Sequence, residues 1–214
     1  MTTPDPVPAA PVARPGSGRI LYIARVGILS AAAIVLMFLE FPLPLMPTFL
    51  KFDFSEIPIL LGAFALGPVA ALLMELIKNL FHLLSTQTGG VGELANFIVG
   101  ASLTVTAGIL YRLHRSRAMA YVAMGVGTLV MAGMAALMNY LVILPFYEQF
   151  MPLQAIIDLT RSVGNTLVTD MGTLILFVFV PFNLFKGLVV SLVVALMYQS
   201  LRPLLVGRNR PPRA

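Results

Sequence analysis

The chain has 214 residues, of which 58% are hydrophobic and only 11% are charged. A soluble domain carries about 25% charged residues, so a water-soluble fold of this length could not bury so much apolar surface. The absence of cysteine excludes a disulfide framework and thiolate metal sites, and the two histidines have no metal-ligand spacing. The net charge of +5 comes from residues near the ends of apolar runs, which argues against nucleic-acid binding. The composition therefore predicts an integral membrane protein.

The apolar runs predict helices in the following order. A Pro- and Ala-rich stretch, residues 1–18, predicts a disordered tail rather than a secretory signal. A short apolar run at 55–66 predicts a helix that Asp53, Ser55 and Glu56 would cap and that Gly67-Pro68 would end. Five runs are long enough to cross a membrane: roughly 20–40, 67–84, 91–113, 118–146 and 170–203. The expected fold is an all-α integral membrane protein, a six-transmembrane-helix bundle over 19–206 with a basic tail at 207–214.

Basic residues favour one orientation of this bundle. With the N-terminus in the cytoplasm, ten of the 14 basic residues take cytoplasmic positions, as the positive-inside rule requires. These ten are Arg14, Arg19, Arg25, Arg112, Arg115, Arg117, Arg202, Arg208, Arg210 and Arg213. Only Lys51 and Arg161 would then lie outside, and an even number of crossings places both termini inside.

Two predicted external segments differ in character. Residues 41–52 contain three prolines, which predicts a stiff, extended loop, and Phe41, Leu45, Met46 and Phe49 give it apolar side chains to cover a flat ligand. Residues 147–165 alternate charged and aliphatic side chains, which predicts an amphipathic surface segment.

Two lysines, Lys78 and Lys186, lie deep within predicted crossings. A charge there costs roughly 2.5–3.5 kcal/mol, so such side chains face the bundle interior and meet a partner. Glu75 precedes Lys78 by three residues and shares its helix face, so these two could form a neutralising pair that contacts no ligand. Lys186 has Asn183 three residues before it and no carboxylate within a turn, which favours a contact with a ligand.

Two single amides, Asn96 and Asn139, interrupt other crossings. In the orientation above, each lies on the order of 8–10 Å below the external surface, near the depth of Lys78. Either amide could instead join two helices, for roughly 0.6 kcal/mol. The convergence of polar positions in the outer half of the membrane nevertheless predicts a cavity that opens to the outside.

Several enzyme and pump signatures are missing from the sequence. It has no Gly-Lys dipeptide, and so no phosphate-binding loop of an ATPase, and it shows no nucleophile elbow or dinucleotide loop. Amides bind ligands but rarely transfer protons. The polar set therefore favours a non-enzymatic, substrate-binding subunit of an uptake system. A stand-alone carrier or an intramembrane enzyme acting on another small molecule is the alternative.

Several separated motifs resemble a known family. They are FPLP at 41–44, KFDFSEIP at 51–58, GAFALGPVAALLMELIKNLFHLL at 62–84, GGVGELANFIVG at 89–100 and VPFNLFKGLVVSL at 180–192. These stretches are similar to those of riboflavin-specific S components of energy-coupling factor (ECF) transporters. The resemblance implies a six-helix protein of the bacterial cell membrane that captures riboflavin from outside and needs no cofactor. It also implies that the protein works with a transmembrane scaffold (T) subunit and two ATP-binding-cassette ATPases.

The resemblance also implies a set of contacts for the vitamin and for the scaffold. Asn183 and Lys186 would meet the polar edge of the ring, and Asn96 and Asn139 would bond other polar atoms, with Glu75 and Lys78 nearby. Phe41, Leu45 and Met46 would cover the ring. Gly27 and Ala31 form a small-x-x-x-small face on the first helix, which would dock on the scaffold.

Overall fold

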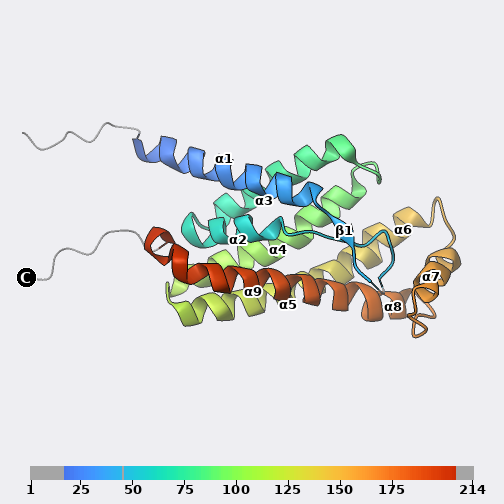
Figure 1. Ribbon diagram of the computed structural model, residues 1–214. Coiled ribbons are helices and arrows are strands. Elements are labelled where there is room, and N and C mark those ends of the chain that lie inside the picture. Colours follow the sequence, from blue (N-terminus) through green and yellow to red (C-terminus); the bar gives the residue numbers. More distant parts are fainter. Residues whose placement is uncertain (1–16, 45, 206–214) are drawn as a thin grey trace, which may run out of the picture.

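The computed structural model describes residues 17–44 and 46–205 and shows an elongated helical bundle (Figure 1). Its long helices are α1 (Ser17–Phe38), α3 (Pro68–His82), α4 (Val91–Leu113), α5 (Arg117–Met138) and α9 (Val180–Leu205). Within this described part, five helical segments are long and apolar enough to cross a membrane. They are Gly18–Phe38, Pro68–Ser85, Val91–Leu113, Arg117–Tyr147 and Met171–Tyr198. The shorter apolar helix α2 (Glu56–Ala65) completes the predicted set, and the all-α fold class is confirmed.

Two of the long segments contain π-helical turns. The segment that begins with α5 continues through the π-helix η2 (Asn139–Ile143) into α6 (Leu144–Tyr147). The segment that ends with α9 begins with α8 (Met171–Leu174) and passes through the π-helix η3 (Ile175–Phe179). A short 3₁₀ turn, η1 (Leu83–Ser85), ends the α3 segment. The π turns were not predicted, because the residue pattern of these crossings does not distinguish a π-helical turn from an α-helical one.

The segments at the loop end of the bundle are short. Strand β1 (Phe41–Pro42) pairs antiparallel with β2 (Lys51–Phe52). The prolines predicted a stiff, extended loop here. Instead, tight turns bring the two ends of the segment together, so the chain between the strands is not extended throughout. Helix α7 (Leu153–Ser162) is the predicted amphipathic segment: Ile156 and Ile157 are buried, and Asp158 and Leu159 are exposed.

The predicted tails lie mostly outside the described residues. Helix α1 already begins at Ser17, within the stretch predicted to be disordered, and α9 ends at Leu205. Residues 1–16 and 206–214 are outside the described part of the chain.

One end of the bundle is filled by aromatic side chains, and the other end holds a cavity. Helix α4 packs against both α3 and α5, and α5 packs against α9. Near the end where α1 begins, Phe64, Tyr111 and Tyr198 form a buried group that we call the aromatic seal. The hydroxyls of Tyr111 and Tyr198 lie 2.8 Å apart, and the rings of Phe64 and Tyr111 lie 4.6 Å apart between centroids. The space between the helices at this end is thus filled by side chains, whereas the opposite end holds a cavity.

Candidate ligand-binding site

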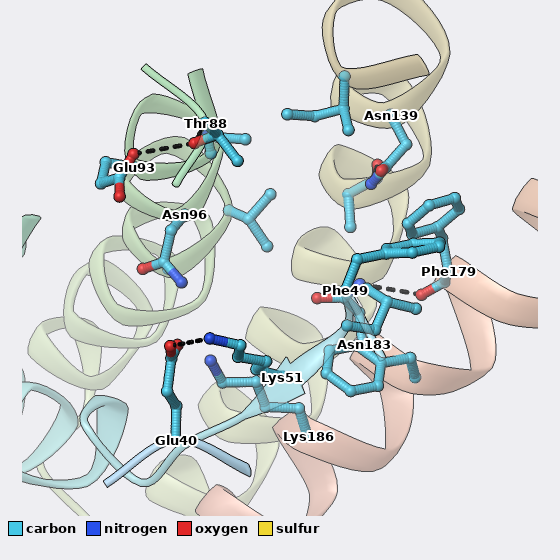
Figure 2. A pocket seen from close by; sticks show the side chains of 18 of the residues that line it. Glu40, Phe49, Lys51, Thr88, Glu93, Asn96, Asn139, Phe179, Asn183 and Lys186 are labelled. Atoms are coloured by element: carbon cyan, nitrogen blue, oxygen red, sulfur yellow. Dashed lines mark hydrogen bonds and ion pairs between the residues drawn. The ribbon is translucent and has the colours of Figure 1, made fainter. Parts of the chain in front are cut away.

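A pocket of about 490 Å³ lies at the end of the bundle opposite the aromatic seal. This volume falls within the roughly 300–1,000 Å³ typical of small-molecule sites. Its walls come from the end of α1, the loop between β1 and β2, the start of α4, the end of α5 with η2, and the η3–α9 junction. Four of the polar residues that the sequence analysis selected line it: Asn96, Asn139, Asn183 and Lys186 (Figure 2). The structure therefore brings together polar groups from α4, η2 and α9.

Two of these amides lie in or just after the π-helices. Asn139 is the first residue of η2, and its Nδ2 donates to the carbonyl of Ala135 at 2.8 Å. Asn183 follows η3 by four residues, and its Nδ2 donates to the carbonyl of Phe179 at 2.9 Å. Each side chain thus uses its donor on its own helix. The Oδ1 atom of each amide is left as an acceptor for a molecule in the pocket.

Asn96 supplies a third amide, and Figure 2 shows it turned from α4 towards the pocket. Its buried Oδ1 has no hydrogen-bond partner among the residues that the structure describes. A buried acceptor without a partner costs about 1–3 kcal/mol. A ligand that donates a hydrogen bond to Asn96 removes this cost.

The floor of the pocket rests on a group of charged side chains that we call the ionic cluster: Asp53, Glu56, Glu75, Lys78 and Lys186. The Nζ of Lys78 lies 2.9 Å from a carboxylate oxygen of Glu56 and 2.9 Å from one of Glu75. All three side chains are buried, which is tolerated because the charges are paired. The predicted Glu75–Lys78 ion pair is therefore present, and the pair lies behind the pocket lining.

Lys186 joins the ionic cluster to the pocket. Its Nζ lies 2.7 Å from Oδ2 of Asp53 and 3.9 Å from Oε1 of Glu56. As the sequence indicated, no carboxylate lies within one helical turn of Lys186, but the fold supplies one from elsewhere in the chain. The partner comes from a residue 133 positions away in the chain, which a search within one helical turn does not reach. Lys186 lines the pocket as well as pairing with Asp53.

The acidic residues before α2 have a different role from the one predicted. Ser55 occupies the N-cap position of α2 without a side-chain capping bond, and Oδ1 of Asp53 accepts from the Ser55 N–H at 2.8 Å. The Ser55 hydroxyl instead accepts from Lys78 at 3.1 Å. These side chains face the buried lysines because an unpaired ammonium costs far more than an uncapped helix end. The sequence signal that could have predicted these ion pairs is charge balance. Two intramembrane lysines, Lys78 and Lys186, need acidic partners, and Asp53 and Glu56 are available.

The mouth of the pocket has a polar rim made of Glu40, Lys51, His82 and Glu93, all of which line the cavity. Lys51 and Glu40 form an ion pair at 2.5 Å, which links the end of α1 to β2 (Figure 2). His82 lies 3.1 Å from Glu93, which links the end of α3 to the start of α4. Sequence patterns did not single out this rim, because its members come from four separate segments.

The loop between β1 and β2 contributes apolar wall residues. Phe49 and Leu50 line the pocket. Phe41 instead packs against Phe52 at 5.6 Å between centroids, and Met46 packs with the cluster under α7. Leu45 lies outside the described residues. Contacts of Phe41, Leu45 and Met46 with a ligand remain a prediction.

The predicted docking face on α1 lies away from the pocket. Gly27 and Ala31 are both exposed, and among the described residues no side chain outside its immediate chain neighbours lies within 4 Å of the position that a Cβ on Gly27 would occupy. This face is open for a partner helix, and docking there remains a prediction.

A helical membrane bundle with a polar pocket at one end has the architecture of a membrane-embedded substrate-binding protein. The family described as "ECF transporter, substrate-specific component" matches residues 21–198, and the chain belongs to this family. Members of this family are transporter components, which removes the intramembrane-enzyme alternative.

Named relatives support this assignment. The chain is 36% identical over 179 residues to "Riboflavin transporter RibU" of Staphylococcus aureus, covering 84% of this chain and 89% of that protein. It is 33% identical over 188 residues to "Riboflavin transporter FmnP" of Bacillus subtilis, covering 86% and 94%.

Solved structures share the fold. One, described as the S component of a bacterial ECF transporter, matches with a TM-score of 0.71 and 34% identity, over 87% of this chain and 98% of that one. A second, ThiT from Listeria monocytogenes, matches with a TM-score of 0.64 at 14% identity, which supports the fold alone.

Proposed function

We propose that this chain is the riboflavin-binding S component of an ECF importer in a bacterial cell membrane. The observation that carries the proposal is the convergence of Asn96, Asn139, Asn183 and Lys186 in one pocket. Riboflavin is uncharged, and the polar edge of its ring alternates acceptors with a donor. The amide oxygens described above suit the ring N–H and the ribityl hydroxyls, and the lysine ammonium suits a ring carbonyl.

The walls of the pocket suit the flat ring. Phe49, Tyr147, Phe179 and Phe182 line it beside aliphatic side chains. Aromatic side chains bury large planar surfaces and stack in offset or tilted arrangements. A three-ring vitamin gains from both kinds of contact, whereas a small ion would not use the apolar walls.

We propose that the pocket opens to the outside. The described arginines near the start of α1 and at the α4–α5 junction lie at the end with the aromatic seal (Figure 1). The positive-inside rule assigns this arginine-rich end to the cytoplasm. Both termini are then cytoplasmic, and the rim faces the external medium.

Transport to the cytoplasm requires partners in this proposal. They are a T subunit and two ATP-binding-cassette ATPases, and the exposed Gly27–Ala31 face of α1 is the proposed docking surface. Small residues there let the backbones of two helices approach closely.

Riboflavin titration tests the proposal. Protein purified from riboflavin-containing medium should be yellow, and the ligand-free protein should quench riboflavin fluorescence with 1:1 stoichiometry. Thiamine, which lacks the three-ring system, should not compete. Colourless protein that leaves riboflavin fluorescence unchanged would refute the proposal.

A further inference from the structure

Asp53 has an unusual position for an acidic residue in a membrane protein. It is 3% exposed, lies between β2 and α2, and does not line the pocket. Both carboxylate oxygens are used: Oδ1 accepts from the Ser55 N–H at 2.8 Å, and Oδ2 accepts from Lys186 Nζ at 2.7 Å. The Ser55 bond fixes the carboxylate to the backbone, so the position of the second oxygen is fixed too.

Lys186 needs such a support. A lysine side chain has a flexible four-carbon stem and an ammonium with three equivalent N–H donors. On its own, it therefore does not hold its ammonium at one place. The Nζ of Lys186 forms one hydrogen bond within the described part of the chain, to Asp53. Two N–H bonds therefore remain, and the side chain lines the pocket floor.

The support extends beyond the pair. Ser55, which holds Asp53, accepts a hydrogen bond from Lys78 at 3.1 Å, and Lys78 in turn pairs with Glu56 and Glu75. This network anchors the segment before α2 to α3. Asp53 thus connects a rigid, fully buried support to a flexible side chain on α9.

We infer that Asp53 is a positioning residue for the ligand: it holds the Lys186 ammonium where it donates to a carbonyl at the polar edge of the bound ring. This inference rests on the proposed function. Asp53 also neutralises the lysine, so the pocket floor accepts an uncharged ring without presenting a bare positive charge.

The test is a double-mutant cycle with riboflavin as the probe, on the full-length protein in detergent. Asp53→Asn keeps the shape of the side chain and an oxygen for the Ser55 N–H but removes the ion pair. It should weaken riboflavin binding by about 10- to 100-fold, the usual effect of losing a hydrogen bond to a charged group. Asp158→Asn makes the same chemical change on the exposed face of α7 and should leave the affinity unchanged.

The cycle separates positioning from general structural support. If Asp53 acts through Lys186, Asp53→Asn should have little further effect in a Lys186→Met background. Equal losses in both backgrounds would overturn the inference, and so would an Asp53→Asn protein that binds like the wild type. A wild-type protein that does not bind riboflavin would refute the proposed function itself, which is a separate result.

A second variant covers a failure of Asp53→Asn to fold. Asp53→Glu keeps the charge but moves it by one methylene, so the ammonium should shift and riboflavin binding should weaken at least threefold. The visible absorption bands of bound riboflavin provide a readout that depends on the ammonium at the ring edge. They should move towards those of free riboflavin in Asp53→Glu but not in Asp158→Asn. Unchanged affinity and bands in Asp53→Glu would contradict the inference.

Discussion

Replacing Lys78 with methionine removes the central cation of the ionic cluster. Its Nζ lies 2.9 Å from Glu56 and 2.9 Å from Glu75, and all three side chains are at most 1% exposed. Methionine fills a similar volume but neutralises nothing. Two buried carboxylates then lose their nearest positive charge, and Lys186 is 3.9 Å from the nearer oxygen of Glu56.

The expected cost follows from the burial of this pair. Breaking a buried ion pair by removing one partner destabilises a protein by about 3–5 kcal/mol, because the other charge is left uncompensated. For a domain of this size, each kcal/mol lowers the unfolding temperature by about 2–4 °C. We therefore expect Lys78→Met to lower the midpoint by about 6–20 °C.

Circular dichroism at 222 nm of the ligand-free protein in detergent measures this midpoint. Lys51→Met is the matched control, because its pair with Glu40 has side chains 32% and 26% exposed and should contribute about 0–1 kcal/mol. Adding Glu75→Gln to Lys78→Met should recover part of the loss by removing one stranded carboxylate. Equal midpoints for the Lys78 and Lys51 variants would refute the reasoning.

Three further outcomes are expected. Asn183→Ala should weaken riboflavin binding by about 1–3 kcal/mol in a fluorescence titration, through the loss of an acceptor in a desolvated pocket; an unchanged affinity would place the ring elsewhere. Ala31→Leu should leave riboflavin binding intact and abolish uptake into cells that carry the partner subunits, and normal uptake would exclude docking through this face. Gly100→Ala should lower the unfolding temperature, because a Cβ there would lie 2.8 Å from carboxylate oxygens of Glu56 and Glu75. An unchanged midpoint would contradict this expectation, because it would mean that these two carboxylates move aside without cost.

The sequence predicted the features that depend on local spacing. Long apolar runs gave the crossings, because a membrane-spanning helix must satisfy its backbone within one segment. The Glu75–Lys78 pair followed from its three-residue spacing. Asn96 and Asn139 were selected because single amides are expensive in an apolar helix, and the structure places both in the pocket lining.

The features that the sequence did not predict depend on contacts between distant segments. The Lys186–Asp53 pair joins residues 133 positions apart, and neither helical periodicity nor spacing encodes that distance. The sequence named Phe41 and Phe49 alike for the loop, but only Phe49 lines the pocket, because the β1–β2 pairing places Phe41 against Phe52. Resemblance to a family supplied the ligand hypothesis, which residue patterns alone did not provide.

The aromatic seal has a consequence for cells that make this protein without its partners. Within the described part of the chain, Phe64, Tyr111 and Tyr198 are buried against one another on the side away from the mouth, where side chains fill the space between the helices. Such cells should retain the vitamin in proportion to the number of copies in their membrane, with one molecule held per copy. Raising the external concentration beyond saturation should add nothing, which is the behaviour of a stoichiometric store rather than a leak.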